Sequence, residues 1–252
     1  MPYHARFEID IISALSSQLV AAFEKLDVGP LDESALKSLE QGQGVYQLFH
    51  KAALSYVGQA KSLKNRLTQH RAKISGRRSI DVADMGFKCL YVHKNWTALA
   101  PEDSLIKYHR TLGEGVCPWN GNGFGNHDPG RERETTDKPT EGWDALYPIR
   151  EDWPCSWVSA GEYKAYDLLK SLKAGLPYLL RFQGAQRKST KPHPDLTAAD
   201  VEVPRNAMHA NELLKLVAER LPGWQATAFP SYMILYKEQR HYAHGKIIWA
   251  AG

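Results

Sequence analysis

The apolar positions at the start of the chain follow the spacing of a helix. Between Ile11 and Leu26 they recur every three or four residues. Asp32 then predicts the N-cap of a second, shorter helix that ends near Leu39. Residues 1–41 are therefore expected to form an N-terminal helical arm.

The pattern changes to short β-prone runs after this arm. Val45–Phe49 and Leu54–Val57 flank a tight connection, which predicts a β-hairpin. Gly86–His93 is rich in aromatic and branched residues and predicts a third strand.

A helix is predicted between the hairpin and the third strand. Ser62 is suited to its N-cap, and the helix is expected to end near Ile74, before Gly76. Within it, Arg66 and His70 are four positions apart and therefore share one face.

A further helix is expected to open at Pro101, because proline fits the first helical turn. Glu102 and Asp103 follow, where acids suit the helix macrodipole. From Gly113 to Pro139 the chain is rich in glycine and polar residues, which predicts a long loop. Loops of that length in compact domains are usually functional or disordered.

The remainder of the chain returns to ordered patterns without an internal repeat. We expect helices over Ser159–Ala174 and His209–Arg220, strands over Leu176–Phe182 and Tyr232–Tyr236, and a basic linker over Gln183–Pro194. This part reads as an α+β extension.

The net charge of +4 is small, but the basic residues are concentrated. Between Gln59 and Ile80 there are seven lysines and arginines, one histidine and no acidic residue. Such a run is either a solvated helix face or a track for the phosphates of a nucleic acid. Its position directly after the hairpin favours the second interpretation.

Several features bear on where the protein works. No apolar run approaches 18 residues, so no membrane span is expected. The N-terminus lacks the basic-then-apolar layout of a signal peptide. Cys89, Cys117 and Cys155 fit neither a disulfide framework nor a zinc site. A reducing, cytoplasmic setting is the simplest expectation.

The hairpin and the residues after it resemble the paired signature of the GIY-YIG nuclease superfamily. Gly44-Val45-Tyr46 and Tyr56-Val57-Gly58 carry tyrosines ten positions apart, and Arg66 falls where the family keeps an arginine. A single tyrosine in a strand is more often a packing residue, so the combination carries the resemblance. Glu102, followed three positions later by Leu-Ile-Lys, resembles the family's metal-binding glutamate. The spacing of Arg66 and His70 resembles the restriction-endonuclease branch.

The resemblance implies a role for each of these residues in hydrolysing a DNA phosphodiester. Tyr46, assisted by His70, would activate the attacking water, and Tyr56 would hold the scissile phosphate. Arg66 would stabilise the transition state. Glu102 would be the one protein ligand of Mg²⁺, for which Mn²⁺ can substitute. A phenol with a solution pKa near 10 is a poor base, so either nearby cations stabilise its charged form or His70 takes the proton; the sequence leaves both open.

The family's asparagine is ambiguous in this sequence. Pro118-Trp119-Asn120 is the nearest match to its usual setting but is one residue short, and Asn126 is a competitor. The loop from Asn120 to Arg131 resembles a stretch found in one group of GIY-YIG restriction enzymes. A flexible surface turn is the alternative interpretation of its glycines.

The fold implied is α+β, with a small three-stranded mixed or antiparallel sheet flanked by helices. The expected domains are the arm (1–41), a catalytic core with the glycine-rich loop (42–130) and a C-terminal extension for DNA recognition or dimerisation (131–252). Candidate DNA-binding residues are Lys61, Lys64, Arg71, Lys73, Arg77, Arg78, Asn126 and Arg131.

The resemblance implies a type II restriction endonuclease of a prokaryotic cytoplasm. It would act on double-stranded DNA at a short palindrome as a homodimer, because a two-fold protein reads a two-fold site. A repair or mobile-element nuclease and a non-catalytic DNA-binding protein on a nuclease core are the alternatives. The recognition sequence, cut position and methylation sensitivity do not follow from the sequence.

Overall fold

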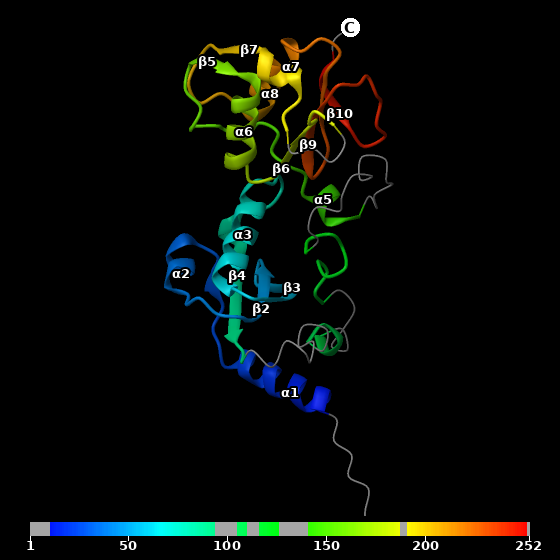
Figure 1. Ribbon diagram of the computed structural model, residues 1–252. Coiled ribbons are helices and arrows are strands. Elements are labelled where there is room, and N and C mark those ends of the chain that lie inside the picture. The colour runs from blue at the N-terminus through cyan, green and yellow to red at the C-terminus, as the bar shows by residue number, and fades with distance from the viewer. Residues whose placement is uncertain (1–10, 94–104, 110–115, 126–140, 187–190, 251–252) are drawn as a thin grey trace, which may run out of the picture. The chain divides into compact units, whose positions relative to one another are not determined.

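The computed structural model divides the chain into two compact units (Figure 1). An N-terminal unit comprises residues 1–71 and 81–125, and a C-terminal unit comprises residues 72–80 and 126–252. The residues that the structure describes are 11–93, 105–109, 116–125, 141–186 and 191–250.

An antiparallel sheet forms the centre of the N-terminal unit. Strand β2 (Gly44–His50) lies between β3 (Ala53–Ala60) and β4 (Met85–Tyr91) and is antiparallel to both. The predicted α+β fold with a small three-stranded sheet is confirmed. A two-residue strand, β1 (Gly29–Pro30), adds a fourth member beside β4.

The hairpin between β2 and β3 closes through Lys51 and Ala52, which both have positive φ angles of 49° and 65°. Two-residue hairpin connections favour such angles because their twist matches that of the strands. The pairing shifts register after Leu48, next to this turn. The turn and the shift set Leu48 opposite Tyr56 and Tyr46 opposite Gly58.

The helices predicted from the apolar spacing and from the N-caps Asp32 and Ser62 accompany this sheet, and residues 105–109 are helical as well. The predicted helices are α1 (Ile11–Glu24), α2 (Glu33–Ser38) and α3 (Leu63–Ser75), and a 3₁₀ turn, η1 (Val82–Asp84), precedes β4. Asp32 caps α2, since its Oδ1 accepts from the amide of Ala35 at 2.8 Å. In the described part of the chain, no helix has both the length and the apolar composition needed to cross a membrane.

The alternation of side chains along β2 separates the core from the candidate site. Val45 and Val57 are fully buried and cluster with Leu15, Leu19 and Phe23 of α1. Because neighbouring side chains of a strand point to opposite faces, Tyr46 points the other way and meets α3.

The C-terminal unit contains most of the remaining elements. Its helices are α5 (Trp143–Leu146), α6 (Ala165–Gly175), α7 (Pro194–Ala198) and α8 (Ala210–Glu219). Its strands are β5 (Gly161–Lys164), β6 (Leu179–Phe182), β7 (Asp200–Val203), β8 (Gln225–Ala228), β9 (Tyr232–Tyr236) and β10 (Lys246–Ala250).

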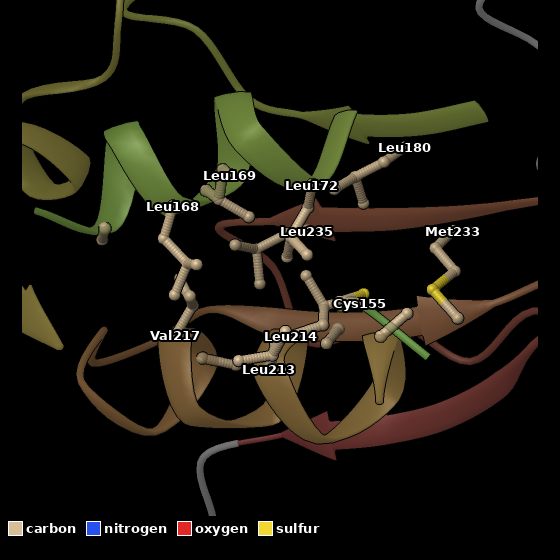
Figure 2. Packing of buried hydrophobic residues seen from close by; sticks show 14 of the residues in the cluster. Cys155, Leu168, Leu169, Leu172, Leu180, Leu213, Leu214, Val217, Met233 and Leu235 are labelled. Carbon is tan, nitrogen blue, oxygen red and sulfur yellow. The ribbon is translucent and has the colours of Figure 1, made fainter. Parts of the chain in front are cut away.

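These strands form two sheets. The larger has the order β10-β8-β9-β6, in which β6 is parallel to β9 and the other pairs are antiparallel. The smaller pairs β5 with β7. Figure 2 shows leucines of α6 and α8 meeting between the two helices, where Leu168, Leu172, Leu213 and Leu214 are at most 1% exposed.

Two sequence predictions for this unit were wrong in part. The helix expected from Ser159 starts only at Ala165, because residues 161–164 form β5 and pair with β7. The strand expected from Leu176 starts at Leu179, after Pro177, which has no amide proton to donate to a ladder. The expected linker ends in α7, which begins at Pro194.

Candidate active site

A buried tyrosine–histidine pair lies at the centre of the candidate site. Tyr46 comes from the middle of β2 and is 0% exposed, and His70 comes from α3 and is 2% exposed. The Tyr46 hydroxyl and the His70 Nε2 atom are 2.7 Å apart and share a hydrogen bond. A bond this short between buried groups fixes both rings and allows a proton to pass between them.

A glycine makes room for the Tyr46 ring. Gly58 lies opposite Tyr46 in the β2–β3 pairing, and a β-carbon at Gly58 would be 2.4 Å from the Tyr46 hydroxyl oxygen. No side chain fits at that distance. Gly58, the last residue of Tyr56-Val57-Gly58, therefore leaves the space that the ring of Tyr46 occupies.

Arg66 lies one helical turn before His70 and contacts the same hydroxyl. Its Nε donates to the Tyr46 oxygen at 3.4 Å, and its Nη2 donates to the carbonyl of Gly125 at 3.2 Å. Burial alone would lower the pKa of Arg66, but hydrogen bonds and charge interactions with Tyr46 and Tyr56 outweigh it and raise the pKa. The guanidinium thus stays charged beside the phenol.

Tyr56 completes the group from the neighbouring strand. Its ring centroid lies 6.0 Å from that of Tyr46 and 5.7 Å from that of His70. Tyr56 is 6% exposed. The structure therefore brings together four of the residues that the sequence predicted: Tyr46, Tyr56, Arg66 and His70.

Asn120 binds backbone beside this group. Its Oδ1 accepts from the amide of Val57 at 2.9 Å, and its Nδ2 donates to the carbonyl of Val57 at 2.8 Å. The amides of Cys117 and Trp119 also donate to the carbonyls of Leu54 and Ser55. Residues 117–120 of the glycine-rich loop thus cover the outer edge of β3, and Asn120 anchors them.

Three predicted residues lie outside the described part of the chain: Glu102, Asn126 and Arg131. Among the described residues, no group of three or more histidine, cysteine, aspartate or glutamate side chains is placed to hold a metal ion. A site with one protein carboxylate needs no such group. Water and phosphate oxygens complete the coordination of Mg²⁺, which keeps much of its hydration shell.

The predicted basic track is not uniformly available to a ligand. Lys61 is exposed. The Lys64 ammonium donates to two backbone carbonyls at the end of α2, at 2.8 and 3.2 Å. Arg71 forms an ion pair with Glu33 at 3.4 Å. These contacts hold Lys64 and Arg71 against α2 and leave only part of each cation open.

The end of the track belongs to the C-terminal unit. Lys73 lies over the ring of Trp143, and Arg78 pairs with Asp152 at 3.0 Å. The side chain of Arg77 is 4% exposed and forms a buried ion pair. A buried guanidinium has no face for a phosphate, so we leave Arg77 out of the proposed DNA contacts.

Two residues of the loop complete the site and were missed by the sequence analysis. Phe124, 1% exposed, packs against His70 and Tyr56. Gly125 supplies the carbonyl that Arg66 binds. The available signal was the phenylalanine between two glycines, Gly123 and Gly125.

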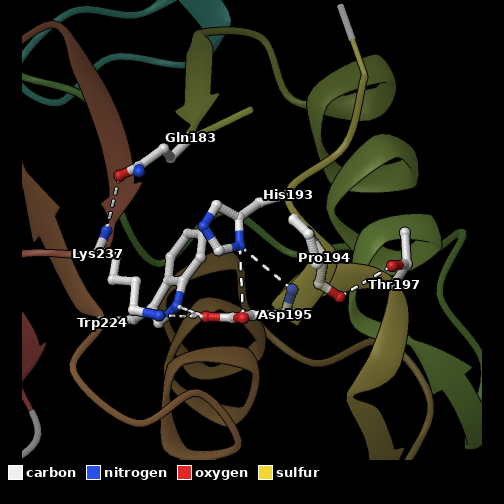
Figure 3. A network of polar contacts seen from close by, with 7 residues as sticks. All are labelled: Gln183, His193, Pro194, Asp195, Thr197, Trp224 and Lys237. Atoms are coloured by element: carbon white, nitrogen blue, oxygen red, sulfur yellow. Dashed lines mark hydrogen bonds and ion pairs between the residues drawn. The ribbon is translucent and has the colours of Figure 1, made fainter. Parts of the chain in front are cut away.

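A second polar cluster lies in the C-terminal unit (Figure 3). The carboxylate of Asp195 accepts from Trp224 Nε1 and Lys237 Nζ, both at 2.9 Å. The amide of Lys237 also donates to Gln183 Oε1 at 3.0 Å. The hydrogen bond from Trp224 has the largest effect on the pKa of Asp195, and together with the bond from Lys237 Nζ it lowers that pKa. A carboxylate held in its charged form by two donors ties α7 to the end of β9, which indicates a structural role.

One known protein family matches part of the chain. Residues 42–156 match the model of the Eco29kI GIY-YIG domain. A search of curated proteins found no match. The matched segment contains the tyrosine pair, the α3 residues and Asn120.

Proposed function

From the match of residues 42–156 to the Eco29kI GIY-YIG domain, we infer that the protein is a restriction endonuclease. The match supports a nuclease activity, with DNA as the substrate. We propose in addition that it hydrolyses double-stranded DNA at a short palindromic site and depends on Mg²⁺. The observation that carries the proposal is the 2.7 Å hydrogen bond between Tyr46 and His70, buried beside Arg66.

This geometry supports a proton path for water attack. As a water oxygen bonds to the phosphorus, its proton passes to the Tyr46 oxygen, and the hydroxyl proton of Tyr46 passes to His70 Nε2. The phenol then needs no full negative charge, which its high solution pKa would disfavour. The bond from phosphorus to the 3′ oxygen breaks, and the 3′ oxygen takes a proton from solvent.

Arg66 supports the same reaction by its charge. A fixed guanidinium fork stabilises the charge that builds on the non-bridging phosphate oxygens. The Nε contact with Tyr46 also places this cation beside the proton path. Tyr56, next to both rings, is assigned to hold the scissile phosphate.

Glu102 is assigned as the protein ligand of the metal, as the family resemblance implies. When bound, Mg²⁺ stabilises charge on the leaving oxygen. Lys61, Lys64, Arg71, Lys73 and Arg78, together with Asn126 and Arg131, are proposed to contact the DNA.

The first test is cleavage of DNA of mixed sequence by the purified chain. With Mg²⁺ we expect discrete fragments, whose sequenced ends share one short palindrome. With EDTA, or with Glu102→Ala, we expect the fragments to disappear, because charge on the leaving oxygen is no longer stabilised. Random degradation would instead support a repair-type nuclease, and cutting in EDTA would contradict the metal assignment.

The second test concerns the oligomeric state. A palindrome places two equivalent half-sites about a two-fold axis, so a protein that reads both is expected to be a homodimer. Sedimentation under cleavage conditions, with and without a duplex that carries the site, should show twice the mass of one chain. A monomer in both samples would contradict this prediction.

A further inference from the structure

Phe124 is buried although it lies in a glycine-rich loop. It is 1% exposed and lies between Gly123 and Gly125. Its ring is stacked on the His70 imidazole, with centroids 4.7 Å apart and an interplanar angle of 17°. Its ring also meets that of Tyr56 edge to face at 5.0 Å. A loop side chain thus touches two residues of the proposed catalytic group.

The stack restrains rotation of the His70 imidazole, which sets the direction of Nε2 for proton transfer. His70 is attached to α3 through rotatable bonds, and its Nε2 must face the Tyr46 hydroxyl at 2.7 Å. A flat ring parallel to the imidazole fixes the plane of the imidazole and hence the direction of Nε2. An aliphatic side chain of similar volume would fill the space without fixing that plane.

Hydrogen bonds on both sides of Phe124 hold this part of the loop in place. Asn120 binds both backbone groups of Val57, and the carbonyl of Gly125 accepts from Arg66. Gly123 has a φ of +95°, a conformation that favours glycine. A β-carbon at Gly125 would lie 2.4 Å from the Tyr56 hydroxyl oxygen. Asn120, Gly123 and Gly125 therefore hold the loop in the conformation that places the Phe124 ring against His70.

We propose that Phe124 is a positioning residue, which stacks on His70 and aligns its imidazole with Tyr46 for proton transfer. This proposal rests on the proposed nuclease function. Besides Phe124, the imidazole contacts the rings of Tyr46 from β2 and Tyr56 from β3. Neither of these restrains the plane of the ring by stacking at so low an angle.

The test is a double-mutant cycle in single-turnover cleavage. Phe124→Leu should lower the rate constant by about 10-fold or more, since small misplacements of catalytic groups have large effects. DNA affinity should be unchanged. In a His70→Ala background the same substitution should change the rate by less than about 2-fold, because coupled residues are not additive. An equal loss in both backgrounds would overturn the proposal.

Controls separate alignment from loss of folding. Phe23→Leu makes the same substitution in the core against α1, where Phe23 is 3% exposed, and should leave the rate per folded molecule unchanged. Phe124→Met is a second variant that refills the volume with a flexible side chain and should resemble Phe124→Leu. A wild-type rate in either folded Phe124 variant would overturn the proposal.

A measurement without DNA distinguishes this proposal from the nuclease function. The ¹⁵N signals of the His70 ring should report one tautomer in the wild type and a mixture in Phe124→Leu. If the wild type cut no DNA, the proposed function would fail, while this spectral change would still support the stack. Identical signals in the two proteins would overturn the positioning role even in an active enzyme.

Discussion

Replacing Arg66 with alanine is expected to lower the rate of DNA cleavage by about 10²–10³-fold, the range seen when a transition-state donor is removed. The Nε and Nη2 atoms of Arg66 both donate in the site, to Tyr46 and Gly125. Loss of the cation removes charge stabilisation of the phosphate and the restraint on the Tyr46 hydroxyl together. Single-turnover rates at saturating enzyme, with affinity measured separately, give the effect on the chemical step.

Two further variants sharpen this prediction. Arg66→Lys keeps the charge but loses the planar fork, so it should recover only part of the rate. Arg220→Ala removes an exposed arginine that follows α8 and should cut at the wild-type rate. Wild-type cleavage by Arg66→Ala would remove this residue from the mechanism.

Replacing Arg77 with alanine is expected to destabilise the C-terminal unit by about 3–5 kcal/mol, as for other buried ion pairs that lose one partner. Arg77 Nη1 pairs with Asp144 at 3.0 Å and also donates to the carbonyls of Tyr147 and Pro230 at 3.1 and 3.0 Å. The guanidinium lies over the Trp143 ring as well. Without it, the Asp144 carboxylate, 12% exposed, loses the charge of this cation at a buried position.

Hydrogen exchange of the α8 amides in increasing denaturant measures the free energy of unfolding of this unit. The adjacent Arg78 is the matched control, because it pairs with Asp152 at 3.0 Å while both side chains are about half exposed. Arg78→Ala should cost no more than about 1 kcal/mol, since solvent screens exposed pairs. If Arg77→Ala were equally mild but weakened DNA binding, Arg77 would belong to the DNA track after all.

The family resemblance predicted which residues meet at the centre of the site. Local geometry accounts for part of this prediction, because the four-residue spacing of α3 puts Arg66 and His70 on one face. Their contacts with Tyr46 depend on how α3 packs on β2. Gly58 is needed because a side chain there would clash with Tyr46, and this requirement becomes visible only once the two residues are paired across the strands.

Other features depend on contacts that no local pattern encodes. Arg77 is one of seven basic residues in a run, and only its burial against Asp144 distinguishes it from its neighbours. Asn120 binds Val57, 63 positions earlier in the chain. The strand β5 forms because β7 pairs with it, although the sequence alone predicted a helix over these residues.

The central claim is that Tyr46, His70 and Arg66 form a metal-dependent site for hydrolysing DNA. The most direct measurement is the single-turnover cleavage of a duplex that carries the recognition site, with Mg²⁺, by the wild type and by Arg66→Ala at equal DNA occupancy. We predict site-specific cutting by the wild type and a rate at least about 10²-fold lower for the variant. Equal rates for the two proteins, or wild-type cutting that persists in EDTA, would contradict the account.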